Sequence, residues 1–318
     1  METLPQIQQQ QEHLLPEDLQ ELLERFLHSQ DIMQISRYTY ERRLRPFFSW
    51  FIKEKKLNPT REDILQYKHH LEIEGLSPST INNYIVAVRR FFSFIESVKV
   101  YPNIAKDIKG VKQQSGFRRD PLTVDQVVEL LKSIETTTRE GKRDFAIINL
   151  LVRTGLRTVE LVRANIGDMS QNGLEGILKV QGKGRSSKDD VVVLTPNTLR
   201  PILDYLGTCR KRARDREPLF TSFSDRNLNS RLTTTSISRI VKEHLSTIGI
   251  NSIRLTAHSL RHSAVTFCLL AGGTIQEAQI LARHKDINTT LIYSHNIDRL
   301  SNPPEKKVDQ LLSEAFNK

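Results

Sequence analysis

The sequence predicts a mainly α-helical protein with a small β-hairpin, built as an N-terminal helical bundle followed by a mixed α+β domain. Three observations predict this class. Apolar residues recur at helical spacing through most of the 318 residues. Two β-rich runs, 177–180 and 191–194, flank a polar loop in the second half. Between the halves, residues 109–119 lack periodicity and carry four basic side chains and no acid.

These signals divide the chain into five expected parts. At this length two domains can each bury a core of their own. The parts are a polar tail (1–11), an N-terminal helical domain (12–108), a basic linker (109–120), a second domain (121–302) and a C-terminal helix (303–318).

Four helices are expected in the N-terminal domain. The first has Pro16 near its start, and the second covers about 36–55, where Pro46 predicts a kink or a break. Thr60 stands as the N-cap of the third helix, and Ser77 caps the fourth, with proline at its first position.

The second domain opens with a capping box, Thr123 and Gln126, ahead of an apolar run. A strongly apolar helix then covers 145–152, and Gly155 fits its C-terminal cap. Arg157 is therefore expected just beyond a buried helix. The two β-rich runs form the hairpin, whose loop carries Lys183.

Composition indicates a globular protein with a polyanionic partner. Hydrophobic residues make up 38% and charged residues 26%, and 47 Lys+Arg against 37 Asp+Glu leave a net charge of +10. Solubility alone is the alternative explanation of this charge. Without an apolar leader or a run of 18 apolar residues, we expect a cytoplasmic protein that does not span a membrane. Cys209 and Cys268 are expected to be buried or free thiols.

A set of basic side chains and one tyrosine suits attack on a phosphodiester without a metal. His258 and Arg261 lie three apart and share a helix face, while Arg157, His284 and Tyr293 complete the set. Arginines bind phosphate oxygens through bidentate hydrogen bonds and stay charged. Each residue alone has an ordinary structural explanation, so the prediction depends on their joint occurrence.

Each member has a candidate role. Arg157 and Arg261 hold the phosphate, and Lys183 protonates the leaving 5′ oxygen. Tyr293 is the nucleophile. His258 acts either as base or as phosphate donor, and His284 adds a further donor.

Metal and nucleotide chemistry are not expected. His258 and His262 are four apart as in a zinc protease helix, but Ser259 stands where that motif has glutamate. No other carboxylate or cysteine cluster has ligand spacing, and no Walker-type loop occurs. We therefore expect no metal and no cofactor.

With these residues in this order, the chain resembles the tyrosine recombinases of the phage integrase family over nearly its whole length. Thr154 to Leu161 matches the T-G-x-R-x-x-E-L motif, His258 to His262 matches H-x-L-R-H, and Tyr293 begins the Y-x-H ending. The resemblance implies a SAM-like core-binding domain before the catalytic domain. It also implies six catalytic residues: Arg157, Lys183, His258, Arg261, His284 and Tyr293.

The family further implies a 3′-phosphotyrosyl intermediate and a Holliday junction, formed by four protomers on two double-stranded DNA sites. Each site is expected to be an inverted-repeat core site, and a second recombinase or accessory protein is a possible partner. The C-terminal helix is expected to dock on a neighbouring protomer, with packing on its own domain as the alternative. Glu160 is expected to orient Arg157 or a backbone neighbour. Candidate DNA contacts outside the active site are Arg89, Arg90, Arg118, Arg119, Arg239 and Lys242.

Two points depart from the family pattern. Arg283 stands before the late histidine, where the family often has glycine, and a long cation there could touch DNA or shift His284. Arg185 and Lys188 follow Lys183 closely and are alternative proton donors.

Three functions remain open on the sequence. The leading one is a recombinase, serving either mobile-element integration and excision or dimer resolution. The alternatives are a DNA-binding accessory protein that no longer cuts and a topoisomerase-like relaxer that needs no paired sites.

Overall fold

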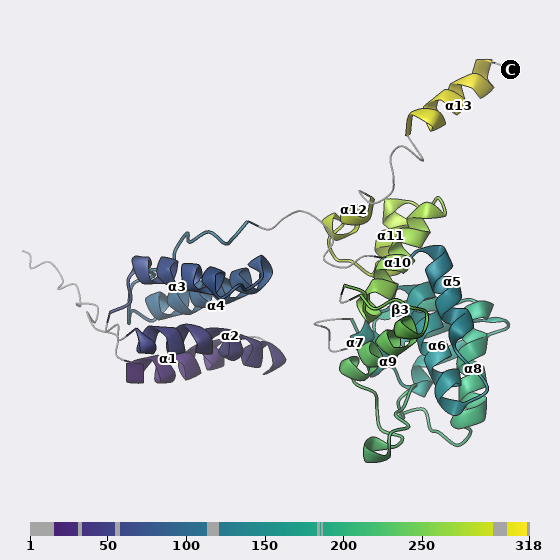
Figure 1. The fold of residues 1–318 in the computed structure, drawn as a ribbon, viewed down its shortest axis with the longest axis horizontal. Coiled ribbons are helices and arrows are strands. Elements are labelled where there is room, and N and C mark those ends of the chain that lie inside the picture. Colours follow the sequence, from purple (N-terminus) through teal and green to yellow (C-terminus); the bar gives the residue numbers. More distant parts are fainter. Residues whose placement is uncertain are drawn as a thin grey trace, which may run out of the picture. The chain divides into compact units, whose positions relative to one another are not determined.

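The structure, a computed structural model, divides the chain into two compact units, residues 1–115 and 116–318. It describes residues 16–30, 34–54, 58–112, 121–182, 185, 187–252, 254–294 and 304–316. Figure 1 shows both units as ribbons. The expected linker at 109–120 lies mostly outside the described residues.

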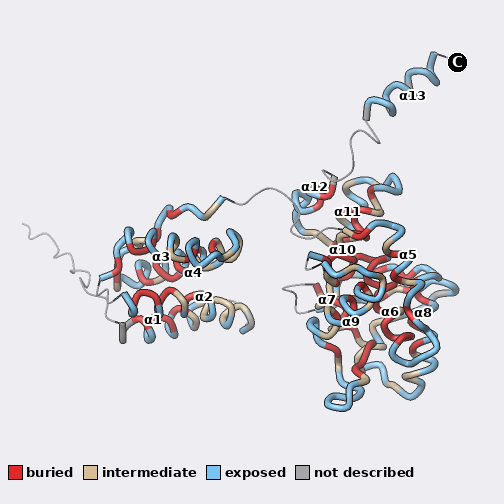
Figure 2. The backbone as a smooth tube through the Cα atoms, in the orientation of Figure 1, coloured by how far each residue is buried: buried red, intermediate tan, exposed pale blue. Residues whose placement is uncertain are grey.

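The first unit is a bundle of four described helices around an aromatic core. Phe26, Phe47, Phe51, Phe91 and Phe92 are each at most 1% exposed and dominate that core. The buried positions follow the inner side of each helix in Figure 2. The helices are α1 (Pro16–Ser29), α2 (Gln34–Lys53), α3 (Arg61–Ile73) and α4 (Pro78–Ser97).

The N-cap residues expected from the sequence begin helices α3 and α4. The Thr60 side chain accepts from the backbone N–H of Asp63, and the Asp63 carboxylate accepts from that of Thr60. The Ser77 hydroxyl accepts from the N–H of Thr80, and proline follows at the first helical position. Of the kink or break expected at Pro46, the break is wrong, because α2 continues through the proline. Phe47 and Phe51, one and five residues after the proline, are buried in the core, and this packing offsets the lost hydrogen bond.

The second unit is mostly helical, with a three-stranded antiparallel sheet. The strands are β1 (Met169–Asn172), β2 (Glu175–Val180) and β3 (Asp190–Leu194), in the order β1-β2-β3. Ile177 pairs with Val193 across the expected hairpin. The sequence did not predict β1. The helices and 3-10 turns are α5 (Val124–Ser133), α6 (Arg139–Thr154), α7 (Thr158–Arg163), η1 (Ile166–Asp168), α8 (Pro196–Cys209), η2 (Asp225–Asn227), α9 (Thr234–Thr247), α10 (Ala257–Leu270), α11 (Ile275–Ala282), α12 (Asn288–Ser294) and α13 (Pro304–Phe316).

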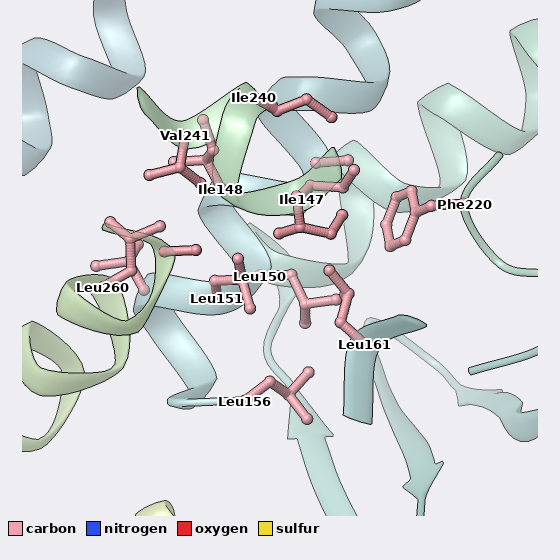
Figure 3. Close-up of a cluster of buried hydrophobic side chains, with 14 of the residues drawn as sticks. Ile147, Ile148, Leu150, Leu151, Leu156, Leu161, Phe220, Ile240, Val241 and Leu260 are labelled. Carbon is pink, nitrogen blue, oxygen red and sulfur yellow. The ribbon is translucent and has the colours of Figure 1, made fainter. Parts of the chain in front are cut away.

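Helix α6 forms the centre of this unit. Its side chains Ile147, Ile148, Leu150 and Leu151 are fully buried, and α8 and α10 both pack against it. Figure 3 shows these residues meeting side chains from α7, α9 and α10. The core therefore fixes the ends of α6, α7 and α10 relative to one another.

Gly155 ends α6 in the left-handed conformation, with φ of 60°, as the sequence predicted. Its N–H donates to the carbonyl oxygen of Leu151. The chain can then turn at once into α7, whose N-cap residue is Arg157.

Candidate active site

Four of the six candidate catalytic residues meet where the ends of several helices converge in the second unit. Arg157 precedes α7, Arg261 lies on the buried side of α10, and His284 follows α11 by two residues. Tyr293 lies on α12, which packs against both α10 and α11. His258 is one turn before Arg261 on α10 and is exposed.

Arg261 is the most deeply buried cation of the group, at 2% exposure. Its Nη1 donates to the carbonyl oxygen of Gly155, and its Nη2 donates to that of Ala282. Burial, and after it the nearby charges of Arg157 and Arg283, lower the pKa of Arg261 to about 9. The guanidinium therefore still carries a positive charge at neutral pH.

Arg157 is held by Glu160 three residues later. The Glu160 carboxylate accepts from the backbone N–H of Arg157 at 2.9 Å and from its Nη1 at 2.6 Å. The side chain of Arg157 keeps 25% of its surface exposed, whereas that of Glu160 is completely buried. Arg157 is thus fixed from within the protein and still presents part of its guanidinium outward.

Glu160 stays ionised despite its burial. Burial by itself raises the pKa of this carboxyl. The positive charge of Arg283 and the hydrogen bonds and charge of Arg157 outweigh that effect, so the pKa is lowered. The Nη2 of Arg283 lies 3.1 Å from Glu160 Oε2, and one carboxylate therefore binds two guanidinium groups.

His284 is neutral at physiological pH. Burial, followed by the charges of Arg261, Arg157 and Arg283, lowers its pKa to about 4. Its Nδ1 lies 2.9 Å from the hydroxyl oxygen of Thr290, a fully buried residue of α12. This contact sets the orientation of the ring.

Tyr293 is almost completely buried, at 4% exposure. Its ring centroid lies 5.2 Å from that of His262 and 6.1 Å from that of His284. The pKa of the phenol is raised, because burial outweighs the positive charges of Arg261 and Arg157, which act in the opposite direction. His258 joins the group through His262, whose ring lies 4.8 Å away at 84°.

A cavity of about 910 Å³ opens beside these residues. Arg157, Arg185, Arg283, His284 and Lys285 are among its lining residues. Asp190 and Asp286 line it as well. The cavity is large enough for a phosphate with its attached sugars.

The hairpin loop between β2 and β3 borders this cavity, but Lys183 itself lies outside the described residues. The two alternative donors are both paired with acids. Arg185 Nη1 lies 3.1 Å from Asp190 Oδ1, and Lys188 forms an ion pair with Asp168.

The candidate DNA contacts lie on both units. Arg89 and Arg90 are exposed on α4 and line a cavity of about 350 Å³ together with Lys106. Arg239 and Lys242 are exposed on α9, and the side chain of Arg239 is 70% exposed. Arg118 and Arg119 fall outside the described residues.

The described part of the chain holds neither a metal-ligand cluster nor a membrane-spanning helix. No three His, Cys, Asp or Glu side chains among those residues are arranged to hold a metal ion. No helix in the same part is long and apolar enough to cross a membrane.

Comparison with protein families decides the identity of this fold. The model of the phage integrase family matches residues 121–299, and that of the phage integrase N-terminal SAM-like domain matches residues 19–99. The chain belongs to the phage integrase family of tyrosine recombinases. This confirms the resemblance and the fold class expected from the sequence.

Relatives in this family match most of the chain. The tyrosine recombinase XerD of Listeria monocytogenes is 31% identical over 287 residues, covering 87% of this chain and 94% of the relative. A tyrosine recombinase of Synechococcus elongatus is 30% identical over 271 residues, covering 81% of this chain and 83% of the relative.

Solved structures of recombinases share the fold. The XerH site-specific recombinase bound to a palindromic difH substrate gives a TM-score of 0.70 at 23% identity, covering 89% of this chain and 82% of that chain. The Tn1549 transposon integrase in complex with transposon right end DNA gives a TM-score of 0.67 at 16% identity, covering 86% and 93%.

Three contacts in this candidate site were not predicted from the sequence: the ring of His262 beside Tyr293, the hydroxyl of Thr290 beside His284, and the contacts of Arg283. His262 stood inside the H-x-L-R-H motif, so a signal for it was present. Thr290 carried no local signal. Arg283 stood out in the sequence only as a departure from the family pattern.

Proposed function

We propose that this chain is a site-specific DNA recombinase that cuts and rejoins duplex DNA through a covalent bond between Tyr293 and a 3′ phosphate. The observation that carries this proposal is the surroundings of Tyr293. The phenol lies against His262 and His284, and the charges of Arg157 and Arg261 act on it. A tyrosine in such a positive field is suited to attack a phosphodiester.

The proposed step conserves the energy of the bond it breaks. The phenol oxygen of Tyr293 loses its proton to a base and attacks the phosphorus, forming a phosphotyrosyl ester on the 3′ side. The bond from phosphorus to the 5′ oxygen breaks, and that oxygen takes up a proton. A 5′ hydroxyl from a partner strand then attacks the phosphotyrosine, and the tyrosine leaves with a proton.

Arg157, Arg261 and His284 are the proposed phosphate ligands. The two guanidinium groups stabilise the charge that builds up on the non-bridging oxygens. His284 is neutral, so it can donate only one N–H. If Thr290 donates to Nδ1, that N–H lies on Nε2 and can reach a phosphate oxygen.

His258 and Lys183, the two remaining candidate catalytic residues, are proposed to transfer protons. His258, exposed at the start of α10, is the proposed base or an additional phosphate donor. Lys183 is the proposed acid for the 5′ oxygen. This assignment is favoured because Arg185 and Lys188 are already paired with Asp190 and Asp168.

Strand exchange needs several copies of the chain. We expect four protomers on two DNA sites, passing through a Holliday junction. Helix α13 is a proposed docking element, since its apolar side chains Val308, Leu312 and Phe316 are 58%, 52% and 88% exposed. The proposal covers both integration or excision of a mobile element and dimer resolution.

The deciding experiment is a covalent-adduct assay. Wild-type protein and Tyr293→Phe are incubated with nicked DNA fragments from the region around the gene, in EDTA, and adducts are resolved on denaturing gels. We expect the wild type to form an adduct in which peptide mapping locates the attached DNA at Tyr293. We expect Tyr293→Phe to bind DNA but to form no adduct.

Three outcomes would contradict the proposal. An adduct on another residue, or strand exchange by Tyr293→Phe, removes the nucleophile assignment. Tight, specific binding with no adduct on any nicked fragment favours the non-cleaving accessory protein.

A further inference from the structure

Arg283 occupies an unusual backbone position directly before His284. It ends α11 with φ of 52° and ψ of 47°, the left-handed region. Side chains other than glycine, asparagine and aspartate are uncommon there, because Cβ crowds the backbone. The chain therefore keeps a long cation at a place where glycine would be less strained, which points to a use for the side chain.

The guanidinium of Arg283 is directed inward. Its side chain is 10% exposed. Nη1 donates to the carbonyl oxygen of Leu281 at 2.8 Å, and Nη2 donates to Gly155 O and to Glu160 Oε2, both at 3.1 Å. Both terminal nitrogens are thus engaged by the protein, so this cation is poorly placed to bind a phosphate itself.

These contacts connect Arg283 to both phosphate-binding arginines. Glu160 accepts from Arg283 on Oε2 and from Arg157 Nη1 on Oε1. Gly155 O accepts from Arg283 and from Arg261. The backbone takes part as well, since Arg157 Nη2 donates to the carbonyl oxygen of Arg283 at 3.2 Å.

The charges explain why a cation is useful at this position. Arg157 and Arg261 are close enough to repel one another, and Glu160 is the buried anion bound to Arg157. The attraction of Arg283 is the largest of the effects that keep Glu160 ionised. Without it, the carboxylate depends on Arg157 alone, and the end of α11 loses its link to the start of α7.

We propose that Arg283 is a positioning residue for strand cleavage. Through Glu160 and the carbonyl oxygen of Gly155, it fixes the guanidinium groups of Arg157 and Arg261 relative to the ring of His284. This inference rests on the proposed function. It concerns the contacts of Arg283, a residue that stands where the family often has glycine.

The test compares Arg283→Gly with Arg283→Lys on a nicked DNA site, measuring single-turnover adduct formation and DNA binding separately. Glycine suits the backbone conformation, so Arg283→Gly removes the guanidinium without straining α11. We expect its cleavage rate to fall between about tenfold and about a hundredfold, the effect of a small misplacement of catalytic groups. The Kd for DNA should change by less than about twofold, because both terminal nitrogens of Arg283 already donate to groups of the protein.

A pH profile separates positioning from a general structural effect. Among the described residues, Arg157, Arg261 and Arg283 are the charged groups that act on Glu160. Removing Arg283 raises the Glu160 pKa, so the acid limb of the cleavage profile should move to higher pH in Arg283→Gly. Arg283→Lys restores the charge and should return the limb to its wild-type position, with partial recovery of the rate.

Each contrary outcome has a distinct meaning. Unchanged cleavage by Arg283→Gly overturns the inference and leaves the proposed function standing. Equal losses in binding and cleavage, without rescue by lysine, make Arg283 a DNA contact and also overturn it. If the wild type forms no adduct, the function fails. Unfolding midpoints between pH 3 and 7 then show whether Arg283 and Glu160 are coupled.

Discussion

Arg261 donates a hydrogen bond to the carbonyl oxygen of Gly155, a residue 106 positions earlier in the chain. This contact joins α10 to the left-handed turn that ends α6. The other terminal nitrogen of Arg261 donates to Ala282 O, at the end of α11. One buried side chain therefore connects three helix ends. We expect its hydrogen bonds to stabilise the folded second unit in addition to any role in catalysis.

Arg261→Lys should destabilise the second unit. Lysine keeps the charge but cannot direct two donors at two separate carbonyl oxygens. We expect the free energy of unfolding to fall by about 1–3 kcal/mol, the cost of leaving a buried polar group unsatisfied. Urea unfolding measures this, with the exposed Arg239→Lys as a control expected to stay within about 0.5 kcal/mol of wild type. Equal unfolding curves for the two variants would refute the structural role.

Thr290→Val should slow cleavage without weakening DNA binding. Valine has the shape of threonine but no hydroxyl, so His284 Nδ1 loses its partner and the ring loses its orientation. A hydrogen bond worth about 1 kcal/mol in the transition state corresponds to roughly fivefold in rate. Single-turnover adduct formation is the measurement, and Thr208→Val, at an exposed threonine of α8, is the control. A rate equal to that of the control would mean that the hydroxyl does not act through His284.

Glu160→Gln should destabilise the protein at pH 7 but much less in acid. The Glu160 pKa is lowered in the folded protein. Its stabilisation is therefore complete above the unfolded value of about 4.3 and is lost as the pH falls through the folded pKa. Removing one partner of a buried ion pair costs about 3 kcal/mol at neutral pH. Urea unfolding at pH 7 and pH 3 tests this.

The matched control for that experiment is Glu277→Gln. Glu277 also has a lowered pKa, caused first by its hydrogen bonds to Thr274, but it lies in an exposed capping box. We expect a much smaller loss than for Glu160→Gln. If the loss for Glu160→Gln is the same at both pH values, the buried charge is not its source.

Arg89→Ala with Arg90→Ala should reduce the salt dependence of DNA binding. Both side chains are exposed on α4, and Lys106 lines the same cavity. For every phosphate that the double variant no longer neutralises, the slope of log Kobs against log salt should fall by about 1. The control is Arg45→Ala, because Glu41 already neutralises Arg45. An unchanged slope would place the DNA on another surface.

Lys183→Ala should be rescued by a better leaving group. We expect loss of about a hundredfold or more in cleavage if Lys183 protonates the 5′ oxygen. Replacing that oxygen with sulfur removes the need for an acid, since a thiolate leaves unprotonated. Adduct formation by Lys183→Ala should then approach wild type, whereas Arg157→Ala stays slow. If the sulfur-substituted DNA rescues Arg185→Ala or Lys188→Ala instead, the residue replaced in that variant is the acid.

The features that could be predicted from the sequence are those set within a few residues. The capping box of Thr123 and Gln126 and the left-handed cap at Gly155 both occur as expected. β1 was missed because Met169–Asn172 is short and mostly polar, and its pairing with β2 is what makes it a strand.

The contacts inside the site could not be predicted in this way, because they join residues that are far apart in the sequence. Glu160 and Arg283 are 123 residues apart, and no local pattern announces their ion pair. Motif spacing could nominate Arg157, Arg261, His284 and Tyr293 as a group. It could not reveal that Glu160 binds two arginines or that Thr290 orients the histidine, because these depend on how α7, α11 and α12 pack.

Helix α12 has a consequence for how activity is lost. Thr290 and Tyr293 are three residues apart on this seven-residue helix, so one short element carries both the tyrosine and the hydroxyl that orients His284. If α12 leaves its place against α10 and α11, both functions disappear at the same moment. Variants that loosen this helix should therefore lower the fraction of competent molecules, while each molecule that remains assembled reacts at the full rate.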